Sequence, residues 1–421
     1  MEYFFVLYIL SGLIKGFLNF FNIPTFIDFT MLTGFIVTMG LFFRVLTHNI
    51  FSFDKTSFIL LAFFLLFYVW INLTLMYSVS QHYSYQKSLL FLTNLISIII
   101  PLFYKSFQIK KFLKLFALLT PILGVIFLMI FPSVIYKSTD EAQALQSLYL
   151  SLPQLCGLCL LLLFLIHDLF PLAVHYLLII INALVIILSG ARGPLVFLIL
   201  VFIFYFFIRG MVPSHHLSQN ITIRKQINLL RFFKILIISG AVVALTVLLV
   251  SYVPNMEKVF ARSQDRMESL FDFATSGTGD ASAEERILRL RYAFDRIAEN
   301  FRATMVGYGL GSYGIMFEGI DERSYPHNII LEIWFETGLI GVLAFMPFFV
   351  FVVYASRHSI SDNPIAWCSL FLFLNFMKSG SLVDLRIFFC FLVIMVLLSR
   401  KQYAKEMPNY NVALPIRTQE S

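Results

Sequence analysis

The chain carries apolar runs of about 17–25 residues that recur along nearly its whole length. A run of this length crosses a bilayer as an α-helix, whereas a barrel strand needs only about 9–11 residues. The composition agrees, because 59% of the 421 residues are hydrophobic and only 13% are charged, against about a quarter charged in soluble domains. The sequence predicts an all-α integral membrane protein with about twelve transmembrane helices, near residues 4–18, 26–46, 57–77, 88–104, 112–132, 149–166, 169–188, 194–208, 232–252, 335–355, 365–377 and 384–399.

The distribution of basic residues predicts the orientation of these helices. An even number of spans places both termini on one side, and Lys and Arg gather in segments 105–114, 209–234 and 400–417. Because cytoplasmic loops are enriched in Lys and Arg, both termini are predicted to be cytoplasmic. Anchoring to anionic headgroups then explains the net charge of +7, and no nucleic-acid partner is expected.

One long connection, residues 253–328, separates the ninth and tenth predicted spans and lies outside in this topology. A long loop in a compact bundle is usually functional. The predicted organisation is a bundle of nine spans at 1–252, a large external loop with an amphipathic helix at 253–328, three spans at 329–399 and a polar cytoplasmic tail at 400–421.

Four cysteines are present, and Cys156 and Cys159 form a C-x-x-C inside an apolar run. A redox pair needs an exposed thiol of low pKa, so buried thiols are the preferred interpretation. No metal-ligand spacing appears, and neither a metal nor a cofactor is expected.

The segment "SGARGPL" places Arg192 in a predicted external turn between two apolar spans. The positive-inside bias disfavours arginine on that side, although a snorkelling anchor is an alternative. Gly190 and Gly193 would let a bulky anion approach the backbone. Arg192 is therefore a candidate for anion binding.

The external loop contains "ERILRLRYAFDRIAENF", whose apolar residues recur at helical spacing. Arg286, Arg289 and Arg296 fall within about 80° of one another at 100° per residue on a different face, which suits anion binding. The alternative is a solvated face or docking on headgroups. Next comes "GYGLGSYG", which fits a nest of backbone N–H groups or simply a flexible turn that folds back onto the bundle.

His327 and Asn328 begin a helix at the predicted outer boundary, where either could act only as a cap. Glu332 and Glu336 follow on one side of that helix, and Gly338 permits close helix packing. His327 becomes a functional candidate because the predicted topology places it on the same face as the arginines. Two further external candidates, each with an anchoring role as the alternative, are Lys87 and Lys378.

Arginines grouped at an external membrane face suit a lipid that carries phosphate, because guanidinium binds phosphate bidentately and stays charged. They can also neutralise a departing diphosphate without a metal. Histidine suits the activation of an acceptor hydroxyl. External glycosyl transfer from a lipid diphosphate is consistent with these residues, but a lipid-phosphate flippase would need similar arginines.

Three segments in this order resemble the bacterial O-antigen ligase and O-antigen polymerase superfamily. "SGARGPL" resembles its Ser-Arg-Gly turn, and "LRYAFDRI" followed by "GYGLGSYG" resembles its periplasmic segment. "HNIILEIWFETGLIG" matches the ligase pattern of His-Asn, nine residues, Gly, two residues and Gly. With about twelve spans and a large loop before the tenth, the resemblance covers most of the chain.

The resemblance implies a metal-independent glycosyltransferase of the bacterial inner membrane. It would take glycan from undecaprenyl diphosphate on the periplasmic side, with Arg192 and Arg286 on the diphosphate and His327 at the acceptor as base or orienter. Arg289 is kept as the alternative to Arg286, because the family's arginine lies four residues before an aromatic and position 290 here is Leu. The other expected substrate-binding residues are Arg289, Arg296, Asn328, Lys87 and Lys378.

The expected partners are the undecaprenyl-diphosphate-linked glycan, a glycan or lipid A core acceptor, membrane lipids and the polysaccharide assembly machinery. Polymerisation of O-antigen or another surface polysaccharide is preferred, and ligation of glycan to the lipid A core is the alternative. A twelve-span transporter or flippase is disfavoured, because the polar candidates gather at one face and no internal repeat is visible.

Overall fold

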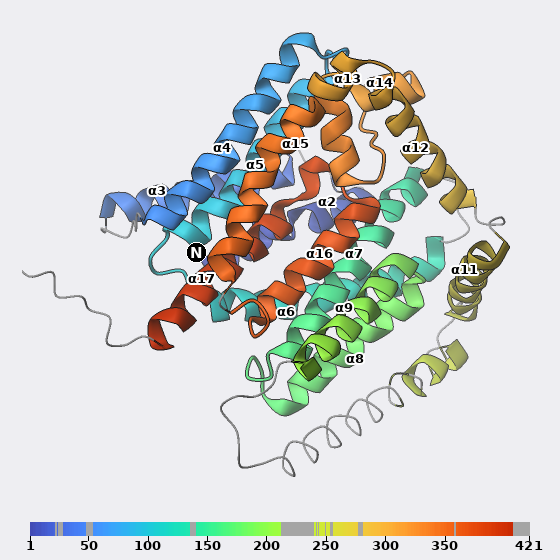
Figure 1. Ribbon diagram of the computed structural model, residues 1–421. Coiled ribbons are helices and arrows are strands. Elements are labelled where there is room, and N and C mark those ends of the chain that lie inside the picture. Colours follow the sequence, from blue (N-terminus) through green and yellow to red (C-terminus); the bar gives the residue numbers. More distant parts are fainter. Residues whose placement is uncertain are drawn as a thin grey trace, which may run out of the picture.

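The computed structural model describes residues 1–21, 23, 28–47, 54–134, 140–211, 240, 242, 244–248, 250–252, 256–276, 281–357 and 359–406. Its regular elements are helices, as Figure 1 shows. They are α1 (Glu2–Ile9), α2 (Ser11–Phe20), α3 (Phe29–Thr47), α4 (Lys55–Thr74), η1 (Leu75–Tyr77), α5 (Tyr83–Phe103), α6 (Ile109–Val134), α7 (Asp140–Leu165), α8 (Leu172–Ser189), α9 (Arg192–Met211), α11 (Met256–Ser276), α12 (Ala281–Ala298), α13 (Phe301–Val306), α14 (Ser312–Glu318), α15 (Ile329–Ser356), α16 (Pro364–Ser379), η2 (Leu382–Asp384) and α17 (Arg386–Glu406).

The all-helical membrane architecture is confirmed. Seven helices in the described part of the chain are long and apolar enough to span a bilayer, and the pair α1 and α2, bent by 61°, makes up to eight. Three further predicted spans coincide with α9, α16 and α17, which do not meet that criterion. The predicted ninth span, 232–252, and the tail beyond residue 406 lie mostly or wholly outside the described residues. The count of twelve stays a prediction.

The bundle has one large apolar core, in which phenylalanines from distant helices stack. Phe91 of α5, for example, contacts Phe64 of α4 at a ring-centroid distance of 5.2 Å. Other large apolar side chains, such as Phe35 and Phe58, are 64% exposed, as expected of surfaces that face lipid. The prediction that Cys156 and Cys159 are buried thiols is confirmed, and Cys368 and Cys390 are buried as well.

The described residues of the predicted external loop, 256–276 and 281–328, form the helices α11, α12, α13 and α14 (Figure 1). Helices α12, α13 and α14 pack on α15 around a small second core that includes Ala293, Ile297, Tyr313 and Phe335. The amphipathic helix predicted in this segment is present as α12. Helix α11, whose buried residues include Met256, Val259 and Ser263, was not predicted, although its apolar residues recur at helical spacing as clearly as those of α12.

The glycine-rich segment 307–314 serves to join this end to the bundle. Gly307, Gly309 and Gly311 all have positive φ, which only glycine adopts readily. A β-carbon on Gly307 would lie 2.6 Å from the backbone nitrogen of Gly338 in α15. The turn interpretation is therefore favoured over a phosphate-binding nest, since the N–H groups of Tyr308 and Gly309 already donate to α15 carbonyls at 3.0 and 2.8 Å.

Cysteine labelling tests the predicted orientation. Glu322 and Ser106 are both exposed and lie in segments predicted to be periplasmic and cytoplasmic respectively. We expect Glu322→Cys to react with a membrane-impermeant maleimide in intact spheroplasts, and Ser106→Cys to react only after lysis. The four native thiols are buried, so their background should be low. Labelling in the opposite order would reverse the orientation.

Candidate functional site

The turn between α8 and α9 presents Arg192 at the first position of a helix. Gly190 ends α8 in the left-handed conformation, with φ 64°, which glycine adopts without the steric cost of a β-carbon. Helix α11 lies against this turn: Ser263 Oγ donates to the carbonyl of Ile187 at 2.8 Å. The guanidinium of Arg192 donates to Ser269 Oγ of the same helix at 3.1 Å. Helix α11 therefore helps to orient Arg192.

A second cation lies at the same helix start. Lys378 is in the last turn of α16, and a β-carbon on Gly193 would come within 3.1 Å of its Cδ and closer still to Nζ. Gly193 is thus the residue that lets Lys378 approach α9. Arg192, Lys378 and the N-terminal end of α9 together form a region of positive potential, because the helix dipole also favours an anion there.

The side chain of Asn328, the residue after His327, connects the start of α15 to the end of α16, where Lys378 lies. Asn328 caps α15, since its Oδ1 accepts from the N–H of Leu331 at 3.0 Å. Its Nδ2 donates to the carbonyl of Met377 at 3.0 Å. The start of α15, where His327 lies, is thereby fixed against the end of α16, where Lys378 lies. Both polar groups of the Asn328 amide therefore have a structural role. The substrate contact that was predicted for Asn328 stays a prediction.

The backbone of His327 is held in an unusual conformation. With φ 59°, it is the only non-glycine residue in the described part of the chain that has a positive φ. Such a conformation is rare in non-glycine residues and gathers at functional sites. The imidazole packs edge-on against Tyr325, with centroids 4.8 Å apart, and its Nδ1 is buried without a hydrogen-bond partner among the described residues.

Burial and two nearby arginines control the charge of this imidazole. Desolvation, followed by the positive charges of Arg286 and Arg289, lowers the pKa of His327 to about 4, because both effects disfavour the imidazolium. The effect of Arg286 also shows that α12 brings this arginine close to His327. His327 is therefore neutral at physiological pH and can accept a proton or a hydrogen bond.

The three arginines of α12 do not form one uniform row. Arg289 is ion-paired with Glu285 and Glu318, at 2.9 and 2.8 Å, and Arg296 is paired with Glu299 at 3.1 Å. Acidic side chains thus hold Arg289 and Arg296, and the charge of Arg286 acts on His327, so Arg286 stays the predicted substrate contact. For Arg296, which is 43% exposed, the structure favours the alternative of a solvated helix face.

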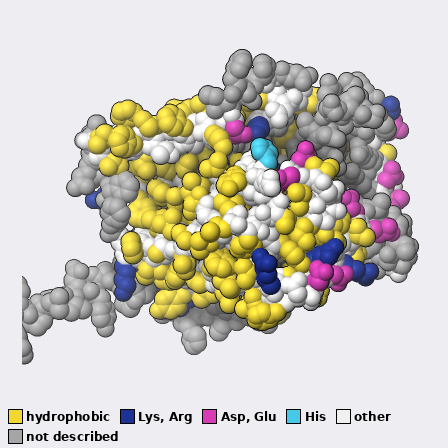
Figure 2. Space-filling view, turned by 90° about the horizontal axis from the view of Figure 1, so that it is seen from above, with side chains coloured by type: hydrophobic (Ala, Val, Ile, Leu, Met, Phe, Trp, Pro, Cys, Tyr) yellow, Lys and Arg dark blue, Asp and Glu magenta, His cyan; other side chains and the backbone are white. Residues whose placement is uncertain are grey.

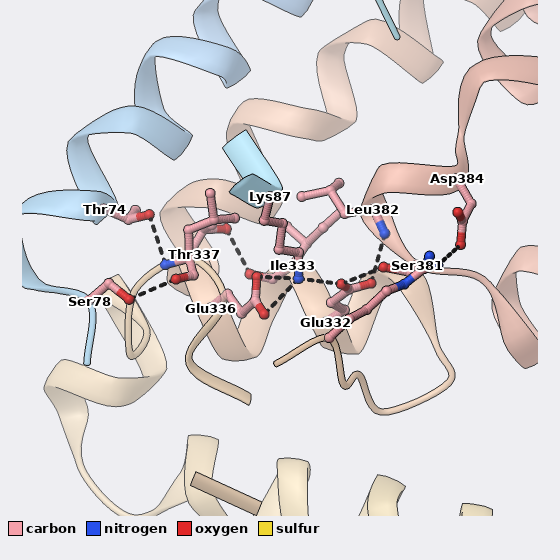
Figure 3. Close-up of polar contacts among 12 residues, drawn as sticks. Thr74, Ser78, Lys87, Glu332, Ile333, Glu336, Thr337, Ser381, Leu382 and Asp384 are labelled. Atoms are coloured by element: carbon pink, nitrogen blue, oxygen red, sulfur yellow. Dashed lines mark hydrogen bonds and ion pairs between the residues drawn. The ribbon is translucent and has the colours of Figure 1, made fainter. Parts of the chain in front are cut away.

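Lys87 was predicted to lie in an external loop, but the structure places it inside α5 with its side chain buried. Its ammonium is fully buried and is held by Glu332 and Glu336 of α15 (Figure 3). The misplacement has a physical reason: an external lysine and a buried, ion-paired lysine look alike when the partner acids lie about 245 residues away along the chain. The i, i+4 spacing of the two glutamates was the available signal.

At Gly338, helix α15 is broken, with φ 69° and ψ −178°. The carbonyls of residues 335–337 consequently lose their helical partners, and three donors from elsewhere replace them: Tyr308 N–H at 3.0 Å, Gly309 N–H at 2.8 Å and Trp70 Nε1–H at 3.0 Å. The first half of α15, residues 329–337, is thus a short separate helix that begins directly after His327.

Figure 2 looks onto the molecule from above the view of Figure 1, the end at which α13 and α14 lie. Charged side chains of both signs and a histidine there interrupt a largely hydrophobic surface. The described residues contain no group of three or more His, Cys, Asp or Glu side chains that could hold a metal ion.

Residues 177–346 match the model of a family described as O-antigen ligase. This region belongs to the O-antigen ligase and polymerase superfamily. The match runs from α8 into α15 and contains Arg192, the helices α11–α14 and His327. Such a family implies a glycosyl-transfer enzyme, and with the apolar helices it fits a multi-pass protein of the bacterial inner membrane. None of the curated proteins matches the chain.

Proposed function

We propose that the protein transfers glycan from undecaprenyl diphosphate to an acceptor hydroxyl on the periplasmic side of the inner membrane, and that it polymerises O-antigen or another surface polysaccharide. The observation that carries the proposal is the link from Arg192 and Gly193 through Lys378 and Met377 to Asn328 and His327. This chain of contacts supports the proposal, because it connects a helix start suited to an anion with the segment that holds His327.

In the proposed reaction, the diphosphate of the donor lies at the start of α9. Arg192 and Lys378 bind it there, and Arg286 approaches from α12. The acceptor oxygen forms a bond to the anomeric carbon while the bond from that carbon to the diphosphate oxygen breaks. Undecaprenyl diphosphate leaves with the bonding electrons, and the fixed cations stabilise its growing negative charge without the need for a metal.

His327 acts on the other substrate. A neutral ring nitrogen accepts a hydrogen bond from the acceptor hydroxyl and takes its proton as the new glycosidic bond forms. The low pKa of His327 suits this task in part only: it keeps the imidazole free of a resting proton, but makes it a weak base. Orientation of the hydroxyl is therefore a large share of its contribution.

Ligation of glycan to the lipid A core is the second candidate, because the matched family carries the description O-antigen ligase. The two reactions share a donor and differ in the acceptor.

The surface glycan of a deletion strain separates the candidates. We expect lipid A core capped with a single repeat, because chain growth stops while ligation continues. Long lipid-linked chains beside uncapped core would show a ligase instead. Unchanged polymer together with failed export of the lipid-linked glycan would show a flippase and contradict an enzymatic role. Complementation with the wild-type chain is the control.

A further inference from the structure

Lys87 joins α5 to the first half of α15 at one buried point. Its Nζ donates to both carboxylate oxygens of Glu336, at 2.7 and 2.8 Å, and to one oxygen of Glu332 (Figure 3). The three side chains are at most 1% exposed. Lys87 comes from α5, and the two glutamates come from the first half of α15, so the contact crosses between helices.

Glu332 extends this contact to the turn between α16 and α17. Its Oε1 accepts from Ser381 Oγ at 3.0 Å, and its Oε2 accepts from the N–H of Leu382 at 2.9 Å. Ser381 follows Lys378 by three residues, and Glu332 follows His327 by five. One buried carboxylate therefore fixes the helix that begins after the histidine to the turn that follows the lysine (Figure 3).

Stability alone is a weak reason for such a cluster. Burying one ammonium and two carboxylates carries a large desolvation cost, and apolar replacements are often neutral or stabilising. The first half of α15 is short and is cut off from the second half at Gly338. The orientation of this half-helix therefore depends on contacts made by its own side chains. The strained backbone of His327 persists only if such contacts hold the surrounding structure firmly in place.

We propose that Lys87, Glu332 and Glu336 form a positioning cluster that sets the placement of His327 relative to Lys378 and so aligns the acceptor with the lipid diphosphate. The inference rests on the proposed function for its substrates. The three residues touch neither substrate. They act through the half-helix of residues 329–337 and the turn at Ser381.

Glu332→Gln tests the cluster with the smallest change. An amide cannot accept from Lys87, Ser381 and Leu382 in the same arrangement, yet it adds no buried charge. We expect kcat in detergent-purified protein to fall roughly 10–100-fold, because misplacement by about 1 Å has effects of this size, while KM for the lipid-linked donor changes less than about threefold. The double variant Lys87→Met, Glu336→Gln keeps the net charge of the cluster and is expected to act in the same direction if the single variant folds poorly.

Asn363→Ala is the matched control. Asn363 is also buried and joins α16 to α17, through Met395 and Ser399, but at the opposite end of these helices. We expect it to lower thermal stability with little change in kcat. A loss of kcat in this control equal to that in Glu332→Gln would reduce the cluster to a structural role.

A distance measurement tests the cluster independently of activity. Spin labels at Leu331→Cys in the first half of α15 and Phe373→Cys in α16 should show a shifted or broadened distance distribution when Glu332→Gln is added. An unchanged distribution with unchanged kcat would overturn the positioning role. A wild-type protein that makes no product from undecaprenyl-diphosphate glycan, but whose distance distribution shifts in the variant, would instead contradict only the proposed function.

Discussion

Arg192→Ala is expected to lose at least about a hundredfold in glycan transfer while the protein stays folded in the membrane. The guanidinium lies at the start of α9, oriented by Ser269 and close to Lys378. Its proposed task is to stabilise the charge that appears on the departing diphosphate, and removal of one such preorganised group typically costs about 10²–10³ in rate. The measurement is product formation by purified protein from undecaprenyl-diphosphate glycan, followed by mass spectrometry.

Arg357→Ala provides the matched control. Arg357 also lies at a helix end, but it follows the last turn of α15 and stacks on Tyr354, away from the start of that helix. The substitution should leave transfer unchanged. Equal losses in both variants would point to a general effect of removing an arginine, and a normal rate in Arg192→Ala would remove this residue from the site.

The sequence was sufficient for the features that depend on local pattern. Apolar runs predicted the helices because each run is long enough to cross the bilayer, and the turn at Arg192 was readable from the glycines around it. The amphipathic helix that became α12 was also found, since its apolar stripe is continuous. Each of these needs only residues that are near one another in the chain.

Contacts between distant segments were not readable in the same way. Lys87 looked like a lysine in a loop because its partner acids lie far away in the chain, on α15. Arg289 was kept as the alternative to Arg286, although the i, i+4 acid Glu285 was visible in the sequence, because its second partner, Glu318, lies beyond α13. The break at Gly338 likewise depends on donors from two other segments. Ion pairs between distant segments therefore set the surroundings of Lys87 and Arg289, and the local sequence pattern does not show them.

Those pairings also change the role of several charged residues that were predicted to bind substrate. Lys87, Arg289 and Arg296 are held by glutamates, so they add little net attraction for an anion. The charge of Arg286 acts on His327, whereas Arg192 and Lys378 are connected to that histidine through the contact between α16 and Asn328.

His327→Ala is expected to reduce transfer by about 10²–10⁴-fold, the usual range for loss of a positioned proton acceptor. His82→Ala is the control, because His82 is an exposed histidine at the start of α5 and should be dispensable. Full activity of His327→Ala would contradict a role at the acceptor. Alanine at this position also changes the φ 59° backbone, so His327→Asn, which tolerates that conformation better, should be equally inactive if the imidazole itself is required.

The pH profile tests the same residue without removing it. Because the pKa of His327 is lowered to about 4, the neutral imidazole should persist on acidification, and wild-type transfer should stay nearly constant down to about pH 5. Arg286 disfavours the imidazolium, so Arg286→Gln should raise the pKa of His327 and move the acid limb of its residual activity to higher pH, in addition to lowering the rate. Arg302→Gln, which removes an exposed arginine stacked on Tyr77, should leave that limb in place. A wild-type acid limb near pH 6.5 would mean that His327 titrates as an ordinary histidine, and that neither burial nor Arg286 controls its proton.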